Sequence, residues 1–206
     1  MVTPAAKTES YVFDFSGGRL CLDFANTVSD RGGEHPRDHL QSYGDFIAWA
    51  EQGGAVPPAL ARDLLRRAAA HPADARRALS RAQSVREAIF HLFAAVSAAR
   101  KPRPADLALL NEEIPAAFGQ MRVAAANDEF VLKPDPAPDD LAFPLTPVVK
   151  SAVDLLTSTD LERVRACAAD TCEWLFLDTT KNRTRRWCDM KICGNREKVR
   201  RFRTRA

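Results

Sequence analysis

Apolar residues recur at helical spacing over most of the first 160 residues of the chain. Side chains that return to one face every three to four positions predict helices over 40–51, 57–70, 72–99, 106–118 and 141–157. The longest of these helices would bury eight side chains, which are Ala78, Leu79, Ala82, Val85, Ile89, Leu92, Phe93 and Val96.

Two other stretches change to the alternation that is typical of strands. Residues 11–15 and 19–28 flank Ser16-Gly17-Gly18, and residues 120–126 and 130–133 flank Asn127-Asp128. Alternating apolar positions around short polar or glycine turns predict two β-hairpins. The predicted fold class is therefore α+β, with a mainly helical N-terminal domain over residues 1–160 and a small module over 161–206.

Four of the five cysteines form two pairs near the C-terminus. The pattern is C-x4-C, fifteen residues, then C-x4-C, and its members are Cys167, Cys172, Cys188 and Cys193. This spacing is typical of a structural zinc site, in which four thiolates leave no open position for catalysis. Two disulfides are the alternative. The opening MVTPAAKTESYVF lacks the apolar core of a signal peptide, which favours zinc and a cytoplasmic location. The fifth cysteine, Cys21, lies in an apolar run and reads as a small buried hydrophobe.

The sequence between and after the cysteine pairs predicts the order of a treble-clef zinc finger. Trp174–Leu177 would be a buried strand, 183–187 the returning strand of a hairpin, and the run after Cys193 a helix. On that helix, Val199 and Phe202 lie three residues apart and would pack inward.

Charge is distributed unevenly along the chain. Residues 163–206 carry 13 Lys/Arg against 5 Asp/Glu, a balance of +8, whereas the chain as a whole is only +3. A basic helix beside a zinc site favours contact with a nucleic-acid backbone, although a solvated basic tail is the alternative. The candidate nucleic-acid-binding residues are Arg183, Arg185, Arg186, Arg196, Lys198, Arg200, Arg201, Arg203 and Arg205.

Two motifs resemble a known family. Cys193-Gly194-Asn195-Arg196, preceded by Cys188 and by Arg185-Arg186-Trp187, resembles the CGNR zinc finger, and GGRLCLDFANTV at 17–28 is similar to the signature of the ABATE domain. The resemblance implies a stress-induced transcription regulator in which the four paired cysteines bind one structural Zn²⁺.

Three polar residues interrupt the apolar run near the N-terminus. Asp23, Asn26 and Thr27 would either cap a turn and bind backbone groups or line a polar pocket for a ligand. Both interpretations stay open at this point.

The motifs favour a regulator that binds DNA and senses a small-molecule effector. No Walker loop, dinucleotide fingerprint, nucleophile elbow or zinc-protease motif is present, so we expect no enzyme. The alternatives are an RNA-binding protein, with Trp187 and Phe202 stacking on bases, or an interaction module or enzyme with a site near Asp23–Thr27. A homodimer would fit, since one finger contacts little DNA. The longest nearly apolar run, 88–99, is too short for a membrane.

Overall fold

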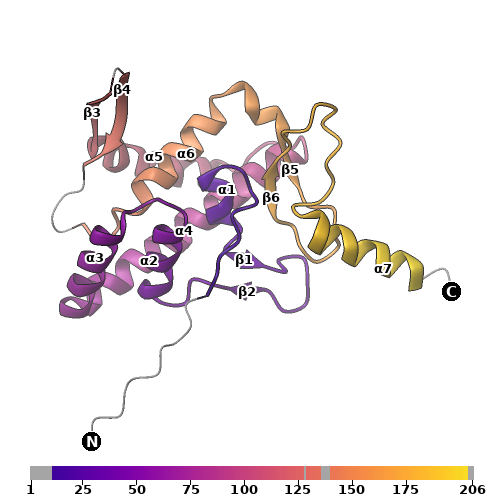
Figure 1. Ribbon diagram of the computed structural model, residues 1–206, viewed down its shortest axis with the longest axis horizontal. Helices are drawn as coiled ribbons and strands as arrows, with labels where there is room; N and C mark the ends of the chain where they lie inside the picture. Colours follow the sequence, from indigo (N-terminus) through magenta and orange to yellow (C-terminus); the bar gives the residue numbers. More distant parts are fainter. Residues whose placement is uncertain (1–10, 128, 136–139, 204–206) are drawn as a thin grey trace, which may run out of the picture.

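A computed structural model describes residues 11–127, 129–135 and 140–203 of the chain (Figure 1). Its helices are α1 Leu20–Ala25, α2 Tyr43–Gln52, α3 Pro58–Ala70, α4 Pro72–Ser97, α5 Pro104–Gly119, α6 Leu145–Leu156 and α7 Asn195–Arg203, with a 3₁₀ turn η1 Thr159–Arg163 and a π-helical turn η2 Met190–Gly194. Its strands are β1 Val28–Ser29, β2 Arg37–Asp38, β3 Met121–Ala126, β4 Glu129–Pro134, β5 Val164–Ala166 and β6 Leu175–Leu177. None of the described helices combines the length and apolar character needed to cross a membrane.

The 26-residue helix α4 forms the centre of the fold. It contacts α1, α2, α3 and α5, and it also contacts the strands β5 and β6 of the C-terminal segment. The predicted apolar stripe of α4 is largely buried, but it also includes an arginine, Arg86. Arg86 donates to both carboxylate oxygens of Asp38 at 2.7 Å, so the buried charge is paired.

The five helices predicted from periodicity are present, with ends that differ by a few residues. The helix α2 begins at a capping box in which Ser42 and Asp45 bind each other's backbone amides. The helices α3, α4 and α5 each carry a proline in the first turn, where a missing amide proton costs nothing. Local start signals of this kind explain why these helices could be predicted.

The hairpin predicted over residues 11–28 is wrong. Residues 20–25 form the helix α1, and residues 11–15 form no strand. Nearly every side chain of α1 is buried, so the sequence has no polar face to separate a helical period from a strand period. A short apolar run buried on all sides is ambiguous for this reason.

The second predicted hairpin is confirmed as β3 and β4, which pair antiparallel from Met121–Pro134 to Ala126–Glu129. This hairpin projects from the helical body in Figure 1. The third predicted strand pair is only partly right. Residues 175–177 form β6, but the returning strand over 183–187 is absent, and β6 instead pairs antiparallel with β5.

The strand β6 joins the helical body to the cysteine segment. Its side chains alternate, with Leu175 and Leu177 in the main hydrophobic core and Phe176 packed in a second cluster with the four paired cysteines. Val164 of β5 also belongs to the main core. The two faces of this short strand therefore pack against different parts of the protein, one against the main core and the other against the cysteine cluster.

Candidate metal centre and the surfaces around it

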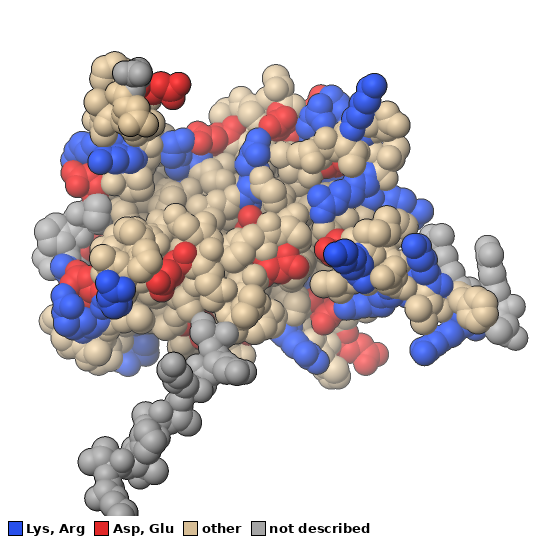
Figure 2. All heavy atoms as spheres, viewed as in Figure 1, with Lys and Arg blue, Asp and Glu red and all other residues tan. Residues whose placement is uncertain are grey.

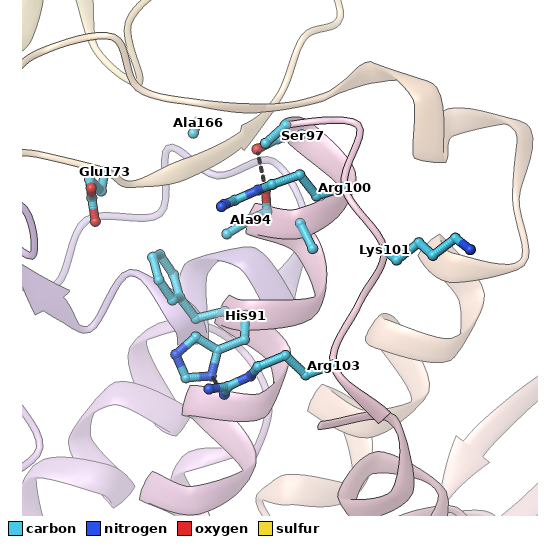
Figure 3. A pocket seen from close by; sticks show the side chains of 11 residues that line it. His91, Ala94, Ser97, Arg100, Lys101, Arg103, Ala166 and Glu173 are labelled. Atoms are coloured by element: carbon cyan, nitrogen blue, oxygen red, sulfur yellow. Dashed lines mark hydrogen bonds between the residues drawn. The ribbon is translucent and has the colours of Figure 1, made fainter. Parts of the chain in front are cut away.

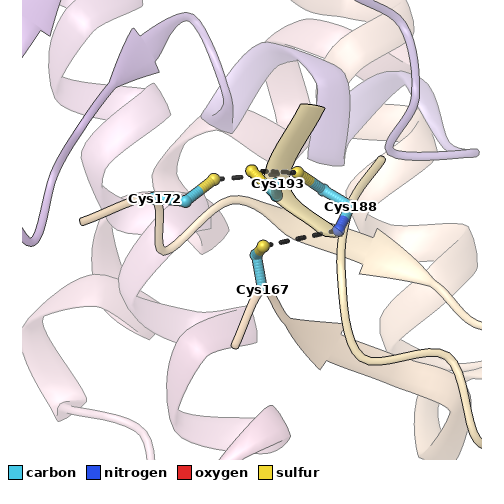
Figure 4. A group of neighbouring side chains, drawn as sticks. All are labelled: Cys167, Cys172, Cys188 and Cys193. Atoms are coloured by element: carbon cyan, nitrogen blue, oxygen red, sulfur yellow. Dashed lines mark hydrogen bonds between the residues drawn. The ribbon is translucent and has the colours of Figure 1, made fainter. Parts of the chain in front are cut away.

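The four paired cysteines come together at one point (Figure 4). Cys167 and Cys172 lie in the loop between β5 and β6, Cys188 lies in the following loop, and Cys193 lies in η2 just before α7. All four Sγ atoms lie within 4.8 Å of one another, and all four residues are buried.

The geometry of the cluster fits one tetrahedral metal ion. Cys188 Sγ lies 3.7 Å from Cys172 Sγ and 3.6 Å from Cys193 Sγ. Zinc–sulfur bonds of about 2.3 Å place tetrahedral sulfurs about 3.8 Å apart, whereas a disulfide bond is about 2.05 Å long. All five cysteines are free thiols, so the disulfide alternative has no support. The cluster is placed to hold one structural zinc.

Electrostatics also favour a cation among the four sulfurs. Hydrogen bonds from Cys172 and Cys188 lower the pKa of Cys167 to about 2. The same hydrogen bonds raise the pKa values of Cys172 and Cys188, while burial and then the negative charge on Cys167 raise that of Cys193. Four thiolates this close cannot all be charged without a compensating positive ion. A bound Zn²⁺ would supply that charge and tie the two loops and α7 into one unit.

The backbone and an arginine hold the cluster in shape. The amide of Cys188 donates to Cys167 Sγ at 3.4 Å. The Arg185 guanidinium donates to the carbonyl of Trp187 at 2.9 Å and to that of Cys188, and it lies over the Phe176 ring at 4.4 Å. These contacts fix the loop that carries the third cysteine.

A loop of the N-terminal part packs on the first cysteine loop. The amide of Gly32 donates to the carbonyl of Thr171 at 3.2 Å, and a Cβ at Gly32 would lie only 2.9 Å from the carbonyl oxygen of Asp170. Arg196, the last residue of the Cys-Gly-Asn-Arg motif, forms an ion pair with Asp30 at 3.4 Å. The motif arginine thus contacts the N-terminal part of the protein.

Asp23, Asn26 and Thr27 are buried and bound to groups of the protein itself. Asp23 accepts a hydrogen bond from the amide of Gly17 at 2.7 Å, and Thr27 Oγ1 donates to the carbonyl of Phe24 at 2.8 Å. Of the two interpretations left open by the sequence, the contacts support backbone binding.

Asn26 connects the helix α1 to the cysteine segment. Its amide nitrogen donates to the carbonyl of Leu175 at 2.8 Å, and its amide oxygen accepts from the Leu175 amide at 2.8 Å. The Leu177 amide donates to the carbonyl of Gly17 at 2.8 Å. Residues on both sides of α1 therefore bind β6 along the edge that β5 leaves free.

The buried Asp23 carboxyl should make stability depend on pH. Burial raises its pKa from 3.8 to about 7, so between these values the folded protein holds a proton that the unfolded chain releases. The contribution of Asp23 to stability therefore falls as pH rises from about 4 to about 7. We therefore expect the free energy of unfolding of Asp23→Asn, relative to wild type, to rise by about 1–3 kcal/mol between about pH 4 and pH 7. The upper limit for one such group is about 1.4 kcal/mol for each pH unit of this window.

The measurement is urea unfolding of the zinc-loaded wild type and Asp23→Asn variant at matched pH values between 4 and 8. Comparison at each pH removes effects that both proteins share, including the protonation of the cysteines. A difference in unfolding free energy that stays constant across the range would contradict the assignment to Asp23.

The predicted nucleic-acid-binding residues differ in what they contact. Three form ion pairs, namely Arg183 with Glu162 at 2.8 Å, Arg196 with Asp30, and Arg200 with Glu197 and Asp170 at 3.0 Å. Arg185 serves the cysteine loop. The exposed cations without an ion pair among the described residues are Arg186, Lys198 and Arg203, while the side chain of Arg201 and all of Arg205 lie outside the described part.

Two further exposed lysines in this segment were missing from the prediction. Lys181 and Lys191 form no ion pair within the described residues, and both lie in turns where no helical stripe draws attention to them. The only sequence signal was the overall charge of residues 163–206. On the face in Figure 2, Lys and Arg side chains gather on the side that carries this segment.

The prediction that Val199 and Phe202 pack inward is wrong. Val199 is 52% exposed and Phe202 is 77% exposed on α7, which extends away from the body (Figure 1), so no apolar surface of the described residues covers them. Trp187, in contrast, is half-buried and packs against the cysteine cluster.

Comparisons with known families agree with this architecture. Residues 18–159 match the ABATE family, described as "Putative stress-induced transcription regulator", and residues 163–206 match the CGNR zinc finger. The comparison with curated proteins found no match.

Proposed function

The chain belongs to the ABATE family, and from this premise we propose that it is a transcription regulator that binds duplex DNA through its C-terminal zinc-finger segment. The observation that carries the proposal is the set of exposed cations that form no ion pair within the described part of that segment. They are Lys181, Arg186, Lys191, Lys198 and Arg203.

The position of these cations suits contact with a phosphate backbone. The helix α7, which carries Lys198 and Arg203, extends outward from the body, so a duplex could lie along it (Figure 1). Phosphate contacts of this kind give affinity and register with little sequence preference. The ion-paired Arg196 and Arg200 would instead hold the segment against the body.

Zinc has a structural role in this proposal. Four cysteine ligands leave no coordination position for a substrate or a catalytic water, so the ion would fix the loops and the start of α7. The proposal assigns no catalytic activity to the chain.

Neutralising three free cations should weaken DNA binding and its dependence on salt. For the triple variant Arg186→Gln, Lys198→Gln and Arg203→Gln, we expect a loss of about 10- to 100-fold at low salt. The slope of log K against log salt should fall by about 3, because each lost phosphate contact removes about 0.9. Fluorescence anisotropy with a random duplex at several salt concentrations measures both quantities.

A charge-matched control separates local contacts from net charge. Arg62, Arg76 and Lys101 are exposed, form no ion pair with a described residue and lie in the N-terminal part, so their triple glutamine variant has the same charge. It should bind as wild type does. Equal losses in both triples, or no loss in either, would contradict a DNA interface on this segment. The stoichiometry of the titration would also test the predicted homodimer.

Single-stranded RNA is the second candidate partner because Phe202 is exposed next to basic residues. Tighter binding of single-stranded RNA than of duplex DNA at the same salt, weakened by Phe202→Ala, would favour it and overturn the duplex proposal.

A further inference from the structure

A cavity of about 380 Å³ lies between the end of α4 and the first cysteine loop (Figure 3). Its walls come from both parts of the protein. Phe90, Ala94 and Arg100 belong to α4 and the turn after it, whereas Ala166 and Glu173 belong to the cysteine segment. The volume falls within the range of about 300–1,000 Å³ that is usual for small-molecule sites.

The floor of the cavity is apolar. It is formed by the ring of Phe90 and by the methyl groups of Ala94, Ala95 and Ala98. The guanidinium of Arg31 lies over the Phe90 ring at 4.0 Å and is itself held by Glu87 at 2.7 Å. A ligand would therefore need an apolar body to cover this floor.

The backbone at the end of α4 directs Arg100 over the cavity. Ala99 has a φ of 51°, and the Arg100 amide donates to the carbonyl of Ala95 at 2.8 Å, which is the hydrogen bond of a Schellman turn. The Arg100 side chain folds back over Ala94, whereas that of Lys101 points the other way (Figure 3). The turn satisfies helix carbonyls that would otherwise repel an anion.

Neither Arg100 nor Lys101 has an acidic partner among the described residues, but Lys101 points away, so Arg100 is the unpaired cation directed over the cavity (Figure 3). Its neighbour Arg103 is engaged by both oxygens of Asp106, at 2.6 and 2.7 Å, and His91 Nδ1 lies 3.4 Å from the same carboxylate. The opposite wall carries Glu173, which would repel a second negative charge. One free guanidinium facing one carboxylate favours a ligand with a single negative charge.

Glu173 also places the cavity next to the metal centre. It directly follows Cys172 and adopts a φ of 56°, a left-handed conformation that costs a glutamate about 1 kcal/mol or more. On the other strand, Ala166 directly precedes Cys167. A ligand that contacts this wall would contact both residues that adjoin the first two cysteine ligands.

We propose that this cavity binds a small organic monocarboxylate with an apolar body, whose carboxylate pairs with Arg100, and that it is the effector site of the regulator. The effector role depends on the function proposed above, whereas the binding itself does not. It also differs from the site near Asp23, Asn26 and Thr27 expected from the sequence.

The test uses benzoate, its neutral amide and its amine analogue as probes for the zinc-loaded full chain without DNA. We expect saturable benzoate binding by calorimetry with a Kd on the order of 1 mM, as befits a very small ligand, and at least tenfold weaker binding of benzamide and benzylamine. Arg100→Gln should weaken benzoate at least tenfold, whereas Arg76→Gln, an equal charge change in the first turns of α4 and away from the cavity, should leave it unchanged.

A second variant changes affinity in the opposite direction. Glu173→Gln removes the opposing charge and should tighten benzoate binding several-fold, a result that loss of folding could not produce. Equal binding of benzoate and benzamide, an unchanged affinity in Arg100→Gln, or equally tight binding of inorganic phosphate would overturn the proposal.

The effector role has a readout that does not require DNA. Saturating benzoate should slow the removal of zinc by a chelator at least threefold in wild type and not in Arg100→Gln. An unchanged rate in wild type would overturn the effector role. Because none of these measurements contains DNA, failure of the DNA proposal would show separately, in the salt titration.

Discussion

Replacing Cys188 with serine is expected to abolish zinc binding and to unfold the C-terminal segment. Its Sγ lies within 3.7 Å of two other sulfurs, and its backbone amide donates to the Sγ of Cys167. Structural zinc contributes about 10–16 kcal/mol of apparent binding energy in small zinc-finger peptides, so losing one ligand removes a large share of what folds this segment. The expected metal content falls from one zinc per chain to nearly none.

The effect should spread beyond the cysteine segment. Leu175 and Leu177 of β6 and Val164 of β5 belong to the main core, so unfolding the segment exposes part of that core. We expect a lower thermal midpoint for the whole chain and faster hydrogen exchange at β6. Metal analysis by mass spectrometry and amide exchange measure these outcomes.

Cys21→Ser provides the matched control for this change. Cys21 is fully buried in α1, and burial raises its pKa to about 12, so it stays a neutral thiol away from the metal. The variant should be less stable but keep one zinc per chain. Full zinc content in Cys188→Ser, or loss of zinc in Cys21→Ser, would contradict the assignment of ligands.

The parts of the fold that could be predicted are those set by local sequence. The two C-x4-C pairs predict a metal site from their spacing alone, and the helices α2 to α6 carry caps, prolines and periodic apolar positions. The helix α1 could not be recognised because burial on every side removes the period, and the fate of 183–187 depended on β5, a strand that precedes the first cysteine. Local pattern alone does not determine which strand pairs with β6.

The same limit explains the candidate sites. The sequence does not distinguish a basic residue without an ion pair in the described structure, such as Lys198, from one paired with an acid far away in sequence, such as Arg196 with Asp30. Val199 and Phe202 have the spacing of a buried face, but both side chains are exposed in the described structure because the contacts of α7 with the body are made by its polar residues. Arg100 could not be singled out, since its direction depends on a left-handed Ala99 that no glycine marks.

Replacing Asn26 with aspartate is expected to loosen the connection between the two parts of the protein. The variant can still accept from the Leu175 amide, but it loses the donor to the Leu175 carbonyl and places a carboxylate against it. Asn26 is only 4% exposed, so an unsatisfied carbonyl beside a buried charge should cost about 3 kcal/mol or more. Urea unfolding of the zinc-loaded protein measures this loss, and zinc removal by a chelator should be faster.

Asn195→Asp tests whether the effect of the Asn26 change comes from burial. The Asn195 amide also donates to a carbonyl, that of Lys191 at 2.9 Å, but it is exposed at the start of α7, where a negative charge is favourable. This variant should stay within about 0.5 kcal/mol of wild type. If neither variant is destabilised relative to wild type, β6 is held by its apolar side chains alone. If only Asn26→Asp is destabilised, hydrogen bonds from the signature at 17–28 hold the strand β6 of the zinc-finger segment on the helical body.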